Sequence, residues 1–339
     1  MDRPTVIISP DSLKGCLSAA DAAAAVAAGI TATRPEVAVR TVPLSDGGEG
    51  LVDVLRHRLG GELRYVTVAD PLGRPTSAHY LVLPDGRAVT ESAQAIGLTL
   101  LTAEELDPFV ASSRGLGELV AHIGADPDVR ELVLGVGGVA TVDGGVGMRH
   151  VLAGLPIPVR VASDVRNPLL GEHGAAAVFG PQKGASPADV VELERRLAGL
   201  GHPAAIADHP GAGAAGGIGA MLLAMGATIE SGIELVLSLT DWREAAASAN
   251  LAVTGEGTVD LSSTEGKVVS GVIAAARPSR LPVVVFGGRV HSDGAAALRG
   301  LGAVDVRPLS GSIADAATDL YALGAFVASR LNSWNRAAV

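Results

Sequence analysis

Several clusters of acidic residues, glycines and lysines follow short apolar runs of the sequence. Taken alone, Asp11 or Ser12 is equally consistent with a residue that only caps a turn, and Asp46 with an ordinary tight turn, but the joint placement of the clusters favours a functional site. Carboxylates beside glycine backbone, with a few lysines, suit Mg²⁺ and phosphate, because Mg²⁺ takes oxygen ligands and phosphate takes N–H and lysine donors. In chain order the clusters hold Asp11, Ser12 and Lys14; Asp46 and Glu49; Gly137, Gly138, Thr141 and Asp143; and Glu256, Asp260 and Lys267.

Two more polar segments add candidates for the same chemistry. SDVRNPLLG contributes Asp164 and Asn167, and FGPQKGA contributes Lys183 in a loop rich in glycine and proline. A lysine in such a loop is equally consistent with a solvated side chain that has no chemical role. The function of Lys183 therefore depends on what surrounds it.

The stretch GAGAAGGIG contains Gly211, Gly213 and Gly216 at the G-x-G-x-x-G spacing of a dinucleotide fingerprint, followed by Gly217. That fingerprint directly follows a β-strand, and the preceding AAIADHP is poor strand material. A nicotinamide dehydrogenase is therefore disfavoured. The glycines either form an anion-binding helix N-terminus or allow close helix packing, and the sequence leaves both alternatives open.

Other standard chemistries lack their motifs. Gly266 and Lys267 are followed by valine, so no Walker-type P-loop is present, and the sequence contains no G-x-S-x-G nucleophile elbow. The eight histidines form no H-x-x-x-H pair, which argues against a zinc site. Cys16 is the only cysteine, so no internal disulfide forms, which fits a reducing cytosol.

Composition narrows the classes of partner. A net charge of -10, a pI of about 5.3 and an aromatic content of 3% give neither a basic field nor a stacking surface, so nucleic acid is not an expected partner. The start of the chain has no secretory signal, and the uncharged stretch 211–229 lacks the strongly apolar side chains that insert into bilayers. We expect a cytoplasmic protein without membrane contact, and a homo-oligomer is compatible with the sequence.

The periodicity predicts an α/β fold of a Rossmann-like parallel sheet domain with a second α/β domain inserted in the chain. We expect a helix over 18–30 with Ser18 as its N-cap, and a β-hairpin around PDGR within 62–92. At 339 residues, two domains are expected: 1–61, 108–154 and 240–339 in the first, 62–107 and 155–239 in the second. Parallel strands are expected over 5–11, 39–46, 131–138, 251–257, 281–288 and 303–310.

Long blocks in register resemble the type I glycerate kinase family over nearly the whole chain. SPDSLKGCLSA resembles the opening block of the family, and GGVATVDGGVGM resembles its central glycine-rich block. The other matching blocks are DGGEG, ESAQAIGL, SSRGLGEL, SDVRNPLLG, FGPQKGA, GAGAAGGIG, SGIELVL and TGEGTVDLSSTEGK. The resemblance implies a two-domain α/β fold and ATP- and Mg²⁺-dependent phosphorylation of D-glycerate, with 2-phosphoglycerate favoured over 3-phosphoglycerate.

With this resemblance, the candidate residues receive expected roles. Mg²⁺ is assigned to Asp46 and Asp260, and the proton acceptor to Asp164 or Asp143. Lys183 or Lys267 is expected to neutralise the transferring phosphoryl group. Substrate binding is assigned to Asp11, Ser12, Lys14, Asp46, Glu49 and Asn167, and nucleotide binding to Gly137, Gly138, Thr141, Gly211, Gly213, Gly216, Gly217 and Glu256.

The chain departs from the family pattern at several positions, among them Leu13 and Cys16. Val139 stands where the family has serine, Ser262 where glutamine is usual, and Val269 where proline is usual. A hydrogen-bond partner lost at a buried polar site costs on the order of 1 to 3 kcal/mol, so Val139 and Ser262 matter if they touch a substrate. The alternatives are a kinase for a related small hydroxy acid or a non-catalytic phosphometabolite sensor.

Overall fold

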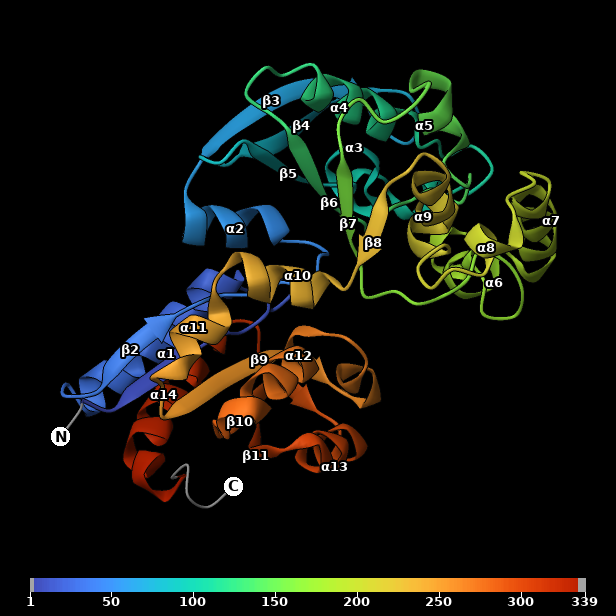
Figure 1. Ribbon diagram of the computed structural model, residues 1–339. Coiled ribbons are helices and arrows are strands. Elements are labelled where there is room, and N and C mark those ends of the chain that lie inside the picture. The colour runs from blue at the N-terminus through green and yellow to red at the C-terminus, as the bar shows by residue number, and fades with distance from the viewer. Residues whose placement is uncertain (1–2, 335–339) are drawn as a thin grey trace. The chain divides into compact units, whose positions relative to one another are not determined.

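The computed structural model describes residues 3–334, and the chain forms two compact units (Figure 1). Unit 1 comprises the chain up to residue 46, residues 53–58 and the chain from residue 233 onward. Unit 2 comprises residues 47–52 and 59–232. Each unit contains one sheet, which confirms the predicted α/β class and the expected two-domain organisation.

The sheet of unit 1 is parallel throughout, with strand order β11-β10-β9-β1-β2. Each of its strands begins within two residues of a predicted start, because buried parallel strands are continuous apolar runs. The strands are β1 (Thr5–Ile8), β2 (Ala38–Thr41), β9 (Leu251–Val259), β10 (Val283–Val290) and β11 (Ala303–Pro308). The helices are α1 (Ala19–Thr33), most of α2 (Leu51–Leu59), α10 (Gly232–Leu239), α11 (Trp242–Ala247), α12 (Val268–Ala276), α13 (Ser292–Leu301) and α14 (Ala316–Arg330), with 3₁₀ turns η4 (Leu261–Thr264), η5 (Arg277–Ser279) and η6 (Leu331–Ser333).

Helices α1 and α14 pack against each other through glycine. A Cβ at Gly29 of α1 would lie 2.0 Å from the carbonyl oxygen of Tyr321, and one at Gly324 of α14 would lie 2.1 Å from the carbonyl oxygen of Val26. Each helix therefore needs a glycine where the other comes closest. The start of α1 is as predicted, since the Ser18 hydroxyl accepts a hydrogen bond from the Asp21 amide.

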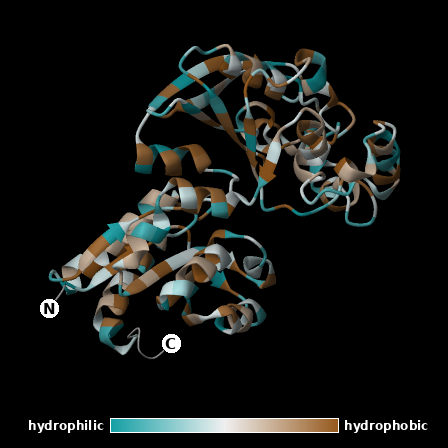
Figure 2. Ribbon diagram, in the orientation of Figure 1, coloured by the Kyte–Doolittle hydropathy of each residue, from teal (hydrophilic) through white to brown (hydrophobic). Residues whose placement is uncertain are grey.

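The sheet of unit 2 is mixed, with strand order β3-β4-β5-β6-β7-β8. The predicted hairpin around PDGR is confirmed, because β4 and β5 pair antiparallel across that turn. Teal and brown residues alternate along β3 and β4 in Figure 2, as expected for strands with one buried face. The strands are β3 (Glu62–Ala69), β4 (Pro75–Val82), β5 (Arg87–Glu91), β6 (Glu131–Gly135), β7 (Val159–Ala162) and β8 (Thr228–Glu230).

The helices of unit 2 are mostly short. Only α4, α7 and α9 exceed ten residues, and α7 is the charged helix expected from the sequence. No helix in residues 3–334 is long and apolar enough to cross a bilayer. The helices are α3 (Ala93–Ile96), α4 (Arg114–Gly124), α5 (Val146–Val151), α6 (Ala175–Phe179), α7 (Pro187–Ala198), α8 (Ala204–Ala207) and α9 (Ala214–Ala224), with 3₁₀ turns η1 (Leu98–Leu100), η2 (Ala103–Glu105) and η3 (Pro181–Lys183).

One segment lies in a different unit from the one predicted. The sequence predicts that residues 108–154 belong to the first domain, but β6 hydrogen-bonds to β5 on one side and to β7 on the other. Unit 2 is therefore one continuous segment from residue 59 to 232, with the short piece 47–52 added. The hairpin and β6 belong to one sheet, because the chain leaves β5, crosses over through α4 and returns as β6, which pairs parallel to β5.

Candidate active site

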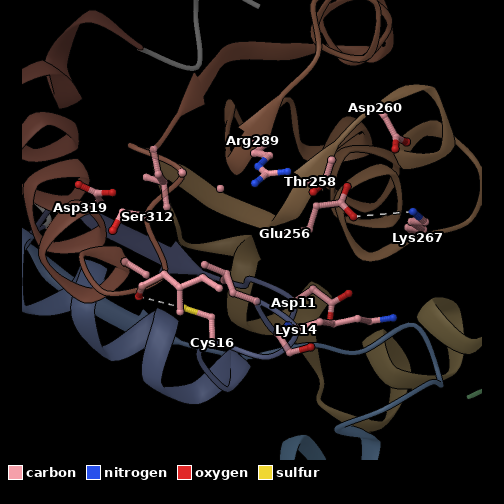
Figure 3. Close-up of a pocket in the computed structure, with 18 of the residues that line it drawn as sticks. Asp11, Lys14, Cys16, Glu256, Thr258, Asp260, Lys267, Arg289, Ser312 and Asp319 are labelled. Carbon is pink, nitrogen blue, oxygen red and sulfur yellow. Dashed lines mark hydrogen bonds and ion pairs between the residues drawn. The ribbon is translucent and has the colours of Figure 1, made fainter. Parts of the chain in front are cut away.

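A cavity of about 410 Å³ in unit 1 gathers many of the predicted site residues (Figure 3). Its walls come from the β1–α1 loop, the ends of β9 and β10, and the segment that leads from β11 into α14. These walls lie beyond the carboxyl ends of the strands, where parallel sheets bind their ligands. Seven predicted residues line the cavity: Asp11, Ser12, Lys14, Asp46, Glu256, Asp260 and Lys267.

The β1–α1 loop is fixed to the neighbouring strand. The Asp11 amide donates to the Gly255 carbonyl at 2.9 Å, which continues the β1–β9 pairing past the end of β1. Just before it, the hydroxyl of Ser9 accepts a hydrogen bond of 2.7 Å from the buried Trp242 indole. The Asp11 carboxylate accepts from the Ser12 amide at 2.7 Å. Asp11 is therefore held in a defined position, whereas the side chain of Lys14 is exposed.

The end of β9 carries a connected chain of polar groups. The hydroxyl of Ser262 donates to Asp260 at 2.6 Å and accepts from the Lys267 ammonium at 2.7 Å. Lys267 also lies 3.9 Å from Glu256, the ion pair drawn in Figure 3. Asp260 also caps η4, because its carboxylate accepts a hydrogen bond from the Ser262 amide. The turn between β9 and α12 therefore fixes the positions of Asp260 and Lys267 relative to each other.

The acidic end of the cavity is electrostatically unfavourable without a cation. Burial, together with the nearby charges of Asp46 and Glu256, raises the pKa of Asp11 to about 7 against the opposing effects of the Ser12 amide and Lys14. Burial also raises the pKa of Glu256 above its usual value. By contrast, the hydrogen bonds from Ser262 lower the pKa of Asp260, which is therefore an anion at neutral pH.

These residues suit a divalent cation. One carboxylate oxygen of Glu256 is buried without a hydrogen-bond partner, and the repulsion that raises the pKa of Asp11 would be relieved by a positive ion. Within residues 3–334, no three acidic, histidine or cysteine side chains form a complete metal cage. Mg²⁺ does not require one, because it usually binds one or two carboxylates together with water and substrate phosphates.

Sequence reasoning missed several residues of this cavity. Arg289, near the end of β10, adds a third cation, and Figure 3 shows its guanidinium directed toward Thr258 and Glu256. The strand-exit rule would have found Arg289, since it follows the glycine pair that closes the predicted strand 281–288. No such rule points to Ser312 or Asp319, which come from the loop before α14 and from α14 itself.

In unit 2, Asp143 organises a loop. Its carboxylate accepts four hydrogen bonds, from the amide and the hydroxyl of Ser113 at 2.9 and 2.7 Å and from the amides of Gly145 and Gly147 at 3.0 Å each. These bonds fold VDGGVG onto the start of α4. They favour a positioning role for Asp143 over the predicted alternative of a proton acceptor.

Lys183 is buried beneath the same loop. Its side chain is 3% exposed, and its amine donates to the Thr141 carbonyl at 2.7 Å. Burial lowers the pKa of Lys183 to about 7, although the charge of Asp143 acts in the opposite direction. The hydroxyl of Thr141 is itself buried without a partner. Lys183 is therefore not a solvated loop lysine, because its amine bonds to the glycine-rich loop. Its contact with the transferring phosphoryl group stays a prediction.

The glycine-rich stretch 211–219 packs closely. The amides of Gly211 and Gly213 both donate to the Asn167 carbonyl, at 3.3 and 2.9 Å. A Cβ at Gly216 would lie 2.0 Å from the Thr141 carbonyl oxygen, and Gly217 adopts φ +90°, which favours glycine. These contacts favour the packing alternative over an anion site. The stretch follows α8, in agreement with the expectation that no strand precedes it.

The other predicted residues also lie in unit 2. Asp164 accepts from the Ser231 hydroxyl at 2.7 Å and the Gly232 amide at 3.1 Å, both at the end of unit 2. Asn167 donates to the His173 carbonyl, and Glu49 is exposed. The carbonyls of Gly137 and Gly138 accept hydrogen bonds from Ser92 and Leu98. The base role of Asp164 and the ligand roles of the others stay predictions.

Two of the departures from the family pattern, Val139 and Ser262, are accommodated locally. Val139 is 2% exposed and packs in the apolar core of unit 2, so its methyl groups replace a hydroxyl in an apolar setting. Ser262 joins Asp260 to Lys267 as described above.

Comparison with known proteins identifies the family. The model of the glycerate kinase family matches residues 6–156 and 152–329, which together cover most of the chain. The chain belongs to the glycerate kinase family. The predicted recognition and the predicted enzyme class, a phosphotransferase that acts on an alcohol group, are thereby confirmed.

Individual relatives agree with this membership. The chain is 38% identical to the glycerate 2-kinase of Escherichia coli K12, over 85% of this chain and 86% of that protein. It is 42% identical to an uncharacterized protein of Mycobacterium bovis, over 97% and 92% of the two chains. The crystal structure of the candidate glycerate kinase 2 of Salmonella typhimurium LT2 superposes with a TM-score of 0.84 at 32% identity, covering 98% of this chain and 99% of that one.

Proposed function

We propose that this glycerate kinase family member transfers the γ-phosphoryl group of ATP to the 2-hydroxyl of D-glycerate, with Mg²⁺ as the required ion. The observation that carries the proposal is the cavity of unit 1, where Asp46, Asp260 and Lys267 line the same walls as Asp11 and Lys14. The name of the Escherichia coli relative, glycerate 2-kinase, supports the 2-hydroxyl as the acceptor.

In this proposal, each group at the acidic end has one task. Asp46 and Asp260 hold Mg²⁺, which when bound would neutralise charge on the phosphates. Lys267 is held by Ser262 and Glu256, so its ammonium is positioned before the substrate arrives and places positive charge on the transferring group. Ser12 and the exposed Lys14 bind the carboxylate of glycerate.

A coupled assay tests the activity itself. The purified protein is mixed with D-glycerate, ATP and Mg²⁺, and ADP release is followed while NAD(H) absorbance serves as the control for dehydrogenase chemistry. We expect ADP release that depends on both glycerate and Mg²⁺. ATP binding without turnover would instead support a phosphometabolite sensor, and turnover with other small hydroxy acids in preference to glycerate would change the substrate.

Two lysine variants test the roles. Lys267→Met is expected to lower kcat by a factor of roughly 100 to 1000, because it removes a charge that acts on the transition state. Lys14→Ala is expected to raise the KM for glycerate, with a smaller change in the KM for ATP. If Lys14→Ala leaves the KM for glycerate unchanged, its assignment to the carboxylate is wrong.

The product identifies the hydroxyl that reacts. NMR of the reaction mixture separates 2-phosphoglycerate from 3-phosphoglycerate, and we expect the 2-isomer. Accumulation of the 3-isomer in the absence of a mutase would refute this part of the proposal and leave the kinase activity standing.

A further inference from the structure

The two ends of the cavity of unit 1 differ in their lining. All of its cations and most of its carboxylates lie on the side of Asp260 and Lys267, whereas Cys16, Ser312 and a single carboxylate, Asp319, lie at the opposite end in Figure 3. That second end is lined by apolar side chains from the β1–α1 loop and from the segment that enters α14. They are Leu13, Leu309, Ile313 and Ala316, with the thiol of Cys16 between them.

Hydrogen bonds hold the segment that forms the apolar end of the cavity in place. The Leu309 amide donates to the Gly287 carbonyl at 2.8 Å, which ties the segment to β10. The Asp319 carboxylate accepts from both the amide and the hydroxyl of Ser310, at 2.9 and 2.5 Å, and so fixes the loop to α14. Ile313 nevertheless leaves 71% of its surface exposed, so this part of the wall is accessible to an incoming ligand.

The size of the cavity indicates which reactant fills it. A three-carbon hydroxy acid occupies only a small part of about 410 Å³ and has no apolar group to place against Leu309 or Ile313. A nucleoside triphosphate has a flat, weakly polar base at one end and a polyanionic tail at the other. The polyanionic tail of such a ligand thus matches the end that holds Lys267 and Asp260, and its base matches the apolar side chains at the other end, where the one carboxylate, Asp319, is already bonded to Ser310.

We infer that the base of the nucleotide binds at the apolar end, against Leu13, Leu309 and Ile313, with its polyphosphate extending toward Lys267 and Asp260. This inference rests on the proposed kinase function and adds to it the subsite that recognises the base. The exposed surface of Ile313 is then buried by the ligand, and the purine lies next to the only thiol of the chain.

Cys16 provides a direct measurement of occupancy. The rate of its modification by a chromogenic disulfide reagent is measured alone and with saturating ATP, inorganic triphosphate or D-glycerate. We expect ATP to slow the modification by about tenfold or more, whereas triphosphate, which has no base, leaves the rate within about twofold. Equal protection by triphosphate, or turnover of ATP without any protection of Cys16, would overturn the inference.

A substitution tests the same subsite by kinetics. Ile313→Ala removes exposed apolar surface and should not disturb folding, and we expect the KM for ATP to rise about fivefold to tenfold with the KM for glycerate unchanged. Val191→Ala, on α7 of unit 2 and also 71% exposed, is the matched control and is expected to change neither constant. An unchanged KM for ATP, or a raised KM for glycerate alone, contradicts the inference.

The two proposals can fail separately. If ADP is released but ATP does not protect Cys16, the kinase stands and the base binds elsewhere. If ATP protects Cys16 but no hydroxy acid is phosphorylated, the base subsite stands and the proposed activity is wrong.

Discussion

Lys183 gives the sharpest test of the structure, because its buried amine makes stability depend on pH. The folded chain holds its pKa at about 7, and the usual value of a lysine is 10.5. Between these two values the unfolded chain binds a proton that the folded chain does not. The free energy of unfolding therefore rises with pH in this window, by about 1.4 kcal/mol per unit, and levels off above the unfolded pKa.

The perturbation is Lys183→Met, which keeps the length of the side chain and removes the titrating amine. The variant loses the hydrogen bond to Thr141, so its stability at high pH is lower than that of the wild type. Its pH dependence, however, lacks the contribution of Lys183. From pH 7 to pH 9 the wild type is expected to gain roughly 2 kcal/mol of unfolding free energy relative to the variant.

The assay is urea unfolding followed by circular dichroism at pH 7, 8 and 9. Val191→Met is the control, because Val191 is 71% exposed and carries no titrating group, so the substitution should leave the pH dependence of the wild type unchanged. If the free energies of unfolding of the wild type and Lys183→Met change with pH in parallel over this range, the inference that the Lys183 amine is buried and neutral in the folded chain is wrong.

Three further substitutions test the contacts around the site. Asp143→Asn is expected to lower the free energy of unfolding in urea by a few kcal/mol, because an amide cannot accept the four hydrogen bonds of the carboxylate. An unchanged free energy of unfolding would contradict the positioning role of Asp143. Gly216→Ala should cost more than about 2 kcal/mol, since its Cβ meets Thr141, whereas Gly201→Ala shares a positive φ in open space and should cost about 1 kcal/mol by the same measurement. Glu256→Gln should raise the Tm without Mg²⁺ and reduce the stabilisation by Mg²⁺, measured by thermal shift; a lower Tm without Mg²⁺ would refute the charge strain at this residue.

The residues of the cavity were predictable because they obey a local rule. Asp11, Asp46 and Asp260 each follow an apolar run, and parallel strands bring their carboxyl ends to one edge. The apolar wall at Ile313 and the contribution of α14 were not predictable. They depend on which helix packs over the edge of the sheet, and the sequence around residue 313 carries no motif.

The burial of Lys183 and the sheet that contains β6 were hidden for a related reason. A glycine- and proline-rich loop predicts an exposed lysine, yet three-dimensional packing places that loop against Thr141. The strand β6 is recognisable by its apolar run, but that run does not say whether its partner is β5 or β1. Periodicity reports which face of an element is covered and leaves the identity of the covering element open.

The paired glycines of α1 and α14 limit how the cavity can change shape. Gly29 and Gly324 interlock the two helices at backbone distance, and α1 follows the loop of Lys14 while α14 follows the loop of Ile313. Sliding one helix past the other would drive carbonyl oxygens into neighbouring backbone. The two sides of the cavity are therefore coupled to a common rigid base, and any adjustment to an incoming ligand has to occur within the short loops themselves.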